Sequence, residues 1–244
     1  MYYSRAVDPT MLVALNAIAT QQASPTKKTM ERVRQLLDSA ASQEEAVLTY
    51  QASDMVLAVN SDAGYLNESK SRSRAGGHFF LSSNIQYPQN NGAILTIAQI
   101  IDAVMSSAAK AELGALFINA KEAVHVRRML TEMGHAQPQT PIQTDNSTAE
   151  GVVNARVRPK RTKLMDMRFE WLLDREQKKQ FKIYWRSGKT NLADYFTKHH
   201  APSHHRNMRG EFLTLVAELT QLRSQKMVGK ETSLLMTDGK INDV

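Results

Sequence analysis

The order of strand-like and helix-like segments along residues 51–200 most constrains how this chain can fold. Three short apolar segments come first, separated by Asn, Gly, Ser and Pro turn signals, which is typical of an antiparallel meander. A long helical pattern over 104–133 follows, with apolar residues three or four positions apart and Gly134 after its end. A strand, two helices, a strand and a short helix complete the order. The strand-like segments are 55–61, 76–83, 93–98, 142–144 and 181–187.

Both ends of the chain are predicted to be helical. An apolar run at 11–19 and a helical pattern introduced by Pro25 and Thr26 indicate that residues 1–50 form a helical extension and not a domain. A C-terminal helix is expected within 201–226, because apolar residues recur at helical spacing over 210–223. The polar tail at 227–244 is expected to be flexible.

The charge of the chain favours a polyanionic partner. Lys and Arg number 31 against 24 Asp and Glu, which gives a net charge of +7. Any one basic cluster has an ordinary explanation as a solvated surface segment, but three clusters around the acidic residues favour binding to a phosphate backbone. The clusters are Arg156, Arg158, Lys160, Arg161 and Lys163; Lys70, Arg72 and Arg74; and Lys178, Lys179, Lys182, Arg186 and Lys189.

The chain has no cysteine, which excludes disulfides and every cysteine-based zinc site. Any metal must therefore be held by oxygen or imidazole ligands. No apolar run approaches the roughly 18 residues that a membrane span requires, and the first residues lack the order of a signal peptide. We therefore expect an intracellular protein, cytoplasmic or nuclear, that is not secreted.

Four carboxylates are the main candidates for chemistry: Asp62, Glu112, Asp145 and Asp194. Each follows a predicted strand or lies on the apolar face of a predicted helix, where a lone acid would cost several kcal/mol to desolvate. Taken singly, each has a structural explanation, as a turn residue, a helix-surface charge, an N-cap or a first-turn acid. A shared cation would remove the desolvation cost of all four. Hard oxygen ligands favour Mg²⁺, with Mn²⁺ as a substitute.

Several motifs, in this order, resemble one family. SDAGY at 61–65, KSRSRAGGHFFLSS at 70–83, TDNSTAEGVV at 144–153 and NLADYFTKHH at 191–200 are similar to segments of the ribonuclease H domain in copia-type LTR retrotransposon polyproteins. Residues 1–50 resemble the helical connection that follows the reverse transcriptase polymerase. The resemblance implies an α/β ribonuclease H-like fold over 51–200, with a five-stranded mixed sheet of three antiparallel and then two parallel strands, flanked by helices.

The resemblance also implies a function. The implied function is a two-metal, Mg²⁺-dependent endonuclease activity that cuts the RNA strand of RNA/DNA hybrids. Asp62 would bridge both ions, Glu112 and Asp145 would complete the first site, and Asp194 would hold the second ion. The implied partners are the hybrid and the polymerase domain of the parent polyprotein. The chain lacks the Asp-Asp pair of a polymerase palm, so no DNA synthesis is expected from it.

Substrate contacts are expected from polar and basic residues near the acids. Two departures from the family pattern bear on the chemistry: RSGKTN fills the loop where relatives often carry a histidine, and Lys110 stands beside Glu112. Arg186 or Lys189 would then be weak candidates for the role of that histidine. The expected nucleic-acid contacts are Ser71, Arg72, Arg74, Asn146, Arg158, Lys160, Arg161, Lys163, Arg186 and Lys189.

Alternatives remain open at this point. The chain could be a catalytically silent nucleic-acid-binding remnant, or a structural connection domain that docks on another polypeptide. His199, His200, His204 and His205 could bind zinc or nickel, although a solvated or phosphate-facing cluster is the better interpretation, because Pro202 interrupts the spacing. The two tryptophans, Trp171 and Trp185, could stack on nucleic acid, but their apolar segments favour the core.

Overall fold

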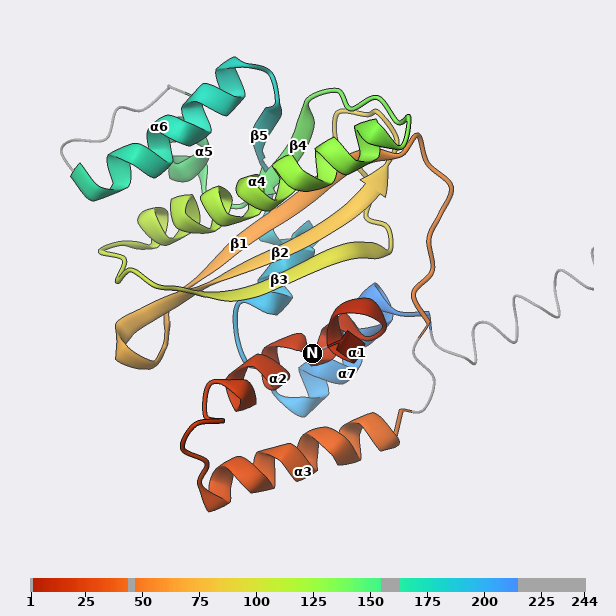
Figure 1. Ribbon diagram of the computed structural model, residues 1–244, viewed down its shortest axis with the longest axis vertical. Coiled ribbons are helices and arrows are strands. Elements are labelled where there is room, and N and C mark those ends of the chain that lie inside the picture. Colours follow the sequence, from red (N-terminus) through yellow and green to blue (C-terminus); the bar gives the residue numbers. More distant parts are fainter. Residues whose placement is uncertain (1, 44–46, 155–162, 215–244) are drawn as a thin grey trace, which may run out of the picture.

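The computed structural model describes residues 2–43, 47–154 and 163–214, with backbone alone at 163–166. Its centre is a five-stranded sheet of order β3-β2-β1-β4-β5 (Figure 1). The first three strands pair antiparallel, whereas β1 with β4 and β4 with β5 pair parallel. This confirms the predicted fold class. The strands are β1 (Val56–Glu68), β2 (Arg72–Ser82), β3 (Ala93–Ile101), β4 (Thr140–Thr144) and β5 (Phe181–Trp185).

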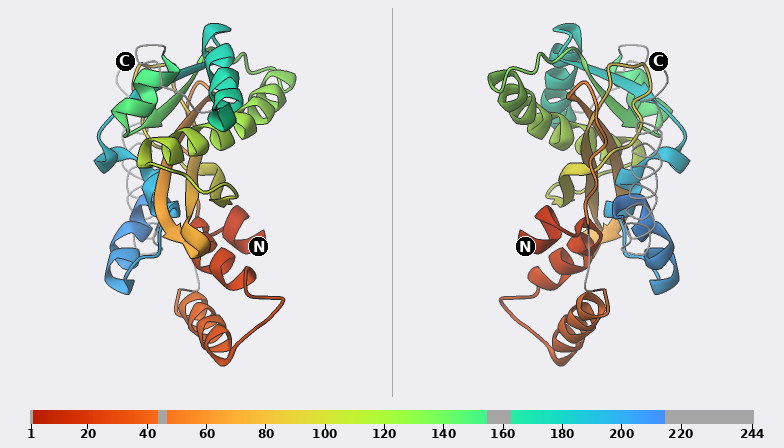
Figure 2. Two further views of the ribbon diagram at one scale, coloured as in Figure 1. Left: turned by 90° about the vertical axis from the view of Figure 1, so that its left-hand side faces the viewer. Right: turned by 90° about the vertical axis from the view of Figure 1, so that its right-hand side faces the viewer.

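Helices lie on both sides of the sheet (Figures 1 and 2). The long helix α4 (Ala108–Glu132) packs against β1 and β2, with α5 (Ser147–Val153) and α6 (Lys163–Gln177) beside it. The opposite side carries the N-terminal helices, the 3-10 helix η4 (Leu192–Phe196) and α7 (Pro202–Phe212). The remaining helices are α1 (Tyr2–Ala6), η1 (Pro9–Met11), α2 (Leu12–Ala19), α3 (Lys27–Ala41), η2 (Ser69–Ser71) and η3 (Gly188–Thr190).

The main core lies between the sheet and α4. Phe79 of β2, Leu116 of α4 and Phe181 of β5 have no exposed surface there. Burying such a side chain contributes about 1.5–3 kcal/mol. The helical spacing of Leu113, Leu116 and Ala120 in α4 faces this layer, and the first seven residues of β1 are all buried.

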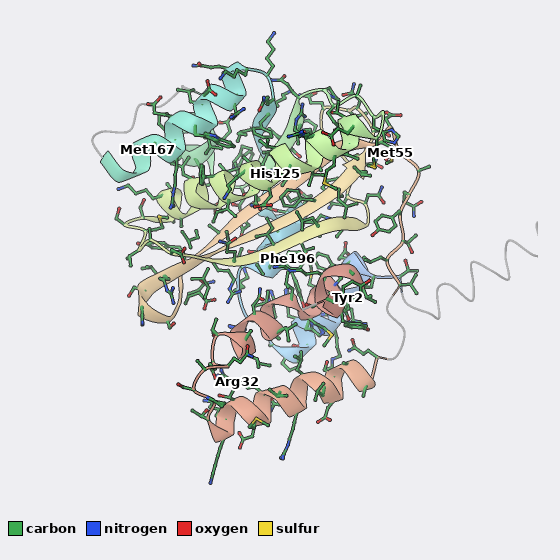
Figure 3. All side chains as sticks on the ribbon, in the orientation of Figure 1. Tyr2, Arg32, Met55, His125, Met167 and Phe196 are labelled. Atoms are coloured by element: carbon green, nitrogen blue, oxygen red, sulfur yellow. The ribbon has the colours of Figure 1, made fainter. Side chains whose placement is uncertain are left out.

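A second core joins the two ends of the described chain. Leu12 and Val13 of α2 pack with Phe196 and Phe212, and Phe196 lies between the sheet and the N-terminal helices (Figure 3). Beneath them, the Arg209 guanidinium pairs with the Asp8 carboxylate, with both side chains at most 6% exposed. The N-terminal helices therefore pack on β3 directly and on the C-terminal segment beside it.

The strands run further than the sequence predicts at one decisive place. The predicted first strand, 55–61, ends before Asp62, whereas β1 continues through Asp62 to Glu68. Strand β2 supports this extension, since Asp62 pairs with Gly76 and Gly64 with Arg74. Asp62 therefore lies within a strand and not at its end.

Other predictions need correction. Trp185, expected in the core, is 51% exposed at the end of β5. Trp171 does pack against the main core. Pro202 begins α7, because proline is favoured in the first helical turn. His199 and His200 therefore precede the helix that carries His204 and His205, in agreement with the predicted interruption of their spacing.

The last predicted helix and tail can be compared with the structure only in part. Helix α7 begins before the predicted 210–223 segment, and residues 215–244 lie outside the described residues. Within the described ranges, we find no helix with the length and apolar character needed to cross a membrane.

Candidate metal centre

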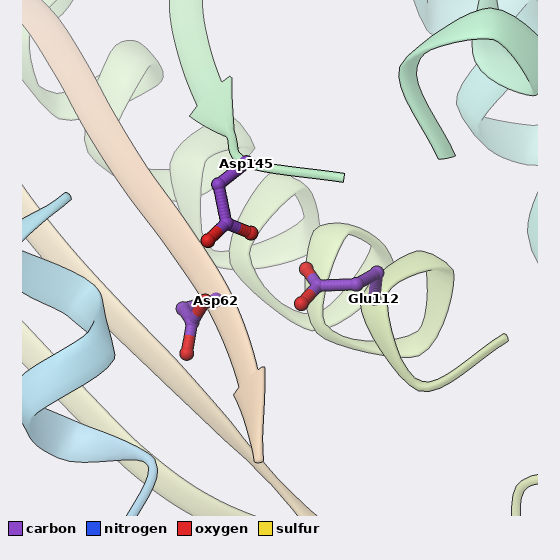
Figure 4. A group of neighbouring side chains, drawn as sticks. All are labelled: Asp62, Glu112 and Asp145. Carbon is purple, nitrogen blue, oxygen red and sulfur yellow. The ribbon is translucent and has the colours of Figure 1, made fainter. Parts of the chain in front are cut away.

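Three of the four predicted acids meet at one place. Asp62 comes from β1, Glu112 from the first turns of α4, and Asp145 follows directly after β4 (Figure 4). Ligand oxygens of the three carboxylates lie within 4.8 Å of one another. A set of oxygen donors this close fits a hard divalent cation such as Mg²⁺.

The sheet topology explains why the three acids converge. Strands β1 and β4 pair in parallel at Val59 with Ile142 and at Asn60 with Gln143, and β4 then ends at Thr144. Past this point β1 continues in its pairing with β2 but no longer pairs with β4, so Asp62 lies beside the carboxyl end of β4, from which Asp145 projects. Ligand sites commonly form outside the carboxyl ends of parallel strands.

Two asparagines fix the surrounding elements to β1. Asn119 of α4 donates to Ser61 Oγ and to the Gly76 carbonyl, both at 2.8 Å. Asn191 donates to the Ser61 carbonyl at 2.9 Å and also caps η4, which carries Asp194. Asn119 was not among the residues predicted from the sequence. An amide in an apolar helical stretch, two turns after Glu112 and on the same face, was the available signal.

Burial and mutual repulsion raise the pKa values of the clustered acids. Desolvation, followed by the charges of Asp62 and Asp145, raises the pKa of Glu112 to about 9. Desolvation and the charges of Asp194 and Asp145 raise the pKa of Asp62 to about 7. The pKa of Asp145 is raised by the same causes, burial first and Asp194 next. In the absence of metal, these shifts keep at least one acid protonated above its usual pH range.

Two hydrogen bonds hold the Glu112 carboxylate toward the other acids. The Ala63 N–H donates to Oε1 at 3.2 Å, and the Thr144 hydroxyl donates to Oε2 at 3.5 Å. Since Ala63 follows Asp62 and Thr144 precedes Asp145, the donors come from the same two strands that carry the other acids. Lys110, expected to place a cation near Glu112, instead bonds Ser106 Oγ at 2.8 Å.

Asp194 stands beside the three-acid group and not within it. Its carboxylate pairs with Lys198 at 2.7 Å, and its side chain is 42% exposed. Its charge nevertheless contributes to the raised pKa values of Asp62 and Asp145, so it lies within electrostatic reach of both. The structure thus brings together three of the four predicted acids and keeps the fourth next to them.

Of the predicted substrate contacts, some are accessible to solvent and one is buried. The expectation for Arg74 is wrong: its side chain is 0% exposed and pairs with Glu68 at 2.7 Å, because β2 begins at Arg72 and not at the predicted start, residue 76. Ser71 and Lys189 are exposed, and Arg72, Asn146 and Arg186 are partly exposed. Arg158, Lys160 and Arg161 lie outside the described residues, as does the side chain of Lys163.

Two of the histidines, His200 and His205, contact Tyr195. The His200 ring stacks on the Tyr195 ring at 4.6 Å between centroids, and His205 Nδ1 hydrogen-bonds the Tyr195 hydroxyl. In the described part of the chain, the histidines do not form a group of three converging metal ligands.

Comparison with known proteins adds a relative and several solved folds. No protein-family model matches the chain. A curated relative, the retrovirus-related Pol polyprotein from transposon TNT 1-94 of Nicotiana tabacum, is 25% identical over 198 residues. The match covers 81% of this chain, which spans 14% of the length of that relative.

Solved ribonucleases H are among the structural matches. A ribonuclease H1 isolated from compost has a TM-score of 0.43 and 10% identity, covering 59% of this chain and 93% of its own. The N-terminal ribonuclease H domain of a Mycobacterium tuberculosis protein has a TM-score of 0.41 and 13% identity, covering 64% and 97%. The solution structure of the PFV ribonuclease H domain has a TM-score of 0.38 and 14% identity, covering 58% and 90%.

The fold assignment rests on the sheet itself. Its order β3-β2-β1-β4-β5, with three antiparallel strands followed by two parallel ones, is the arrangement that the sequence resemblance implied. The expected fold is thereby confirmed: the chain has the ribonuclease H-like fold, and its sequence is similar to that of a retrotransposon Pol polyprotein.

Proposed function

We propose that this chain is a metal-dependent endonuclease that hydrolyses the RNA strand of RNA/DNA hybrids. The single observation that carries the proposal is the convergence of Asp62, Glu112 and Asp145, whose ligand oxygens lie within 4.8 Å of one another. Clustering these acids costs free energy, as their raised pKa values indicate, and a bound cation would offset that cost. A structural role for the cluster would not explain this arrangement.

The proposed cofactor is a pair of Mg²⁺ ions, which Mn²⁺ would replace. Asp62, Glu112 and Asp145 would hold the ions, with Asp194 as the fourth ligand. When bound, such ions lower the pKa of water and stabilise the leaving oxygen in phosphodiester hydrolysis. The protein itself contributes orientation: Ala63 and Thr144 hold the Glu112 carboxylate, and Asn119 and Asn191 hold the elements around Asp62.

Accessible polar and basic groups are the proposed contacts to the nucleic-acid backbone. Ser71 and Arg72 lie where the β1–β2 hairpin turns, and Arg186 and Lys189 follow β5 on the other side of the site. Side chains of this kind bind phosphate and sugar without reading sequence, while contacts to 2′-hydroxyls would distinguish the hybrid from duplex DNA. In the parent polyprotein, which we infer to be of copia type and to act inside the cell, the polymerase domain would be the partner.

The proposal is tested by cleavage of a hybrid whose RNA strand is labelled, in Mg²⁺ and in Mn²⁺. We expect RNA cuts by the wild type and a loss of at least about a thousandfold in Asp145→Asn, because one ligand oxygen charge is removed without change in size. The matched control is Asp174→Asn, since Asp174 pairs with Lys178 on the surface of α6, away from the acids. A duplex DNA of the same sequence should not be cut.

A catalytically silent nucleic-acid-binding domain is the second candidate, and one observation favours it. Lys198 neutralises Asp194 at 2.7 Å, which withholds the proposed fourth ligand from a second metal ion. Salt-sensitive binding of the hybrid, without cleavage in either metal, would support this function and contradict the nuclease.

A further inference from the structure

Trp185 occupies a position that hydrophobic burial does not explain. It is the last residue of β5, and its side chain is 51% exposed. Its indole Nε1–H donates to the Asp145 carbonyl at 2.8 Å. Among apolar side chains only tryptophan brings an N–H donor, so the hydrogen bond accounts for the residue type where packing does not.

The backbone around Asp145 is held by the same segment. Thr144 pairs with Trp185 in the β4–β5 ladder, and the Arg186 N–H donates to the Thr144 carbonyl at 3.0 Å. On its other side, Asn146 caps α5 by accepting from the Ala149 N–H at 2.9 Å. The indole hydrogen bond thus fixes the Asp145 carbonyl, which lies between the β4–β5 pairing at Thr144 and the α5 cap at Asn146.

Gly188 approaches the carboxylate of Asp145 itself. A Cβ on residue 188 would lie 2.6 Å from Asp145 Oδ2, which is closer than van der Waals contact allows. The backbone of Gly188 does not need a left-handed conformation, because its φ is not among the positive values of the chain. Its lack of a side chain therefore makes room for the carboxylate, which packs directly against the bare Cα.

We propose that Trp185 and Gly188 are positioning residues that together set the place of the Asp145 carboxylate in the acidic site. The indole holds the backbone carbonyl, and the glycine sets how closely the side chain approaches the β5–η3 turn. The inference rests on the proposed function in that Asp145 is taken as a metal ligand. Partners of metal ligands commonly change metal affinity by about 10- to 100-fold when removed.

The test uses Trp185→Phe, which keeps an aromatic ring but loses the donor, and Gly188→Ala, which adds the Cβ. In the full chain in EDTA, carboxyl carbon NMR signals report each acid directly. The Asp145 signal should move in both variants, while the signal of Asp174 on α6 should not. Trp171→Phe is the matched control, because Trp171, the other tryptophan of the chain, packs against the main core.

The same variants are then titrated with Mg²⁺ by calorimetry, and their thermal unfolding is measured. We expect Mg²⁺ affinity about tenfold below wild type in each, with unchanged unfolding temperature in Trp185→Phe. An Asp145 signal that stays in place in Trp185→Phe or in Gly188→Ala overturns the inference, as does unchanged Mg²⁺ affinity in a wild type that binds the ion. A wild type that binds no Mg²⁺ contradicts the proposed function alone, because the NMR signals are read without metal.

Discussion

The chain buries carboxylates in two regions, and the charges around the carboxylates differ in sign between them. Asp8, which joins the chain ends, meets the Arg209 guanidinium and accepts from the Thr10 N–H at 3.0 Å. Asp62 and Glu112 are similarly buried, yet the charges that act most strongly on them are those of other acids. In the first region an ion pair stabilises the fold. In the second region the carboxylates repel one another, and a bound cation would reduce that repulsion. Functional sites are where such unfavourable arrangements persist.

The largest effect should come from breaking the satisfied pair. Arg209→Met keeps the length of the side chain but leaves the Asp8 carboxylate buried and unpaired, so we expect a loss of about 3–5 kcal/mol in unfolding free energy by urea denaturation. Adding Asp8→Asn should restore most of the loss, because the stranded charge is removed. If the pair serves structure alone, the folded variants keep wild-type Mg²⁺ affinity; weakened binding would show that the two regions are coupled.

Removing one of the clustered acids should instead raise the unfolding free energy at high pH. The pKa of Glu112 is about 9 in the fold against an ordinary value of 4.5. Between these pH values the folded state holds a proton that the unfolded state has released, so stability falls as pH rises, by at most about 1.4 kcal/mol per pH unit.

In EDTA, therefore, the wild type should lose stability between about pH 6 and about pH 8.5, and Glu112→Gln should lose less and be the more stable of the two at the upper end. Thermal unfolding across this range measures both effects. Mg²⁺ should raise the unfolding temperature of the wild type alone. A Glu112→Gln variant that is less stable than wild type at every pH would show that the cluster contributes to folding as the Asp8 pair does.

The smallest change in stability is expected at the exposed ion pair beside the acidic cluster. Lys198 pairs with Asp194, and the two side chains are 49% and 42% exposed. Lys198→Gln should change stability by less than about 1 kcal/mol, because solvent screens such pairs. It should strengthen Mg²⁺ binding by about threefold in calorimetry, since a cation that lowers the pKa of Asp62 and Asp145 is removed. Unchanged affinity would place Asp194 outside the metal centre.

The sequence predicts much of the fold and of the acidic cluster. The apolar periods predicted the five strands and the long helix, and a short helix was expected after the last strand, where Asp194 lies. The acids Asp62, Glu112 and Asp145 were singled out because buried positions are costly for lone carboxylates, and the structure brings them together. The prediction of Arg74 as a phosphate contact failed because local charge spacing does not show that a strand begins at Arg72.

The element order, the core between α4 and the sheet, and the residue types able to hold a hard cation follow from local periodicity and chemistry, and the sequence therefore predicts them. Long-range packing sets the rest: β4 ends beside Asp62, Lys198 pairs with Asp194, and the exposed Trp185 donates to the Asp145 carbonyl. Periodicity reports which side of an element is buried. It does not report which neighbour each side chain meets, since those contacts join residues far apart in the chain.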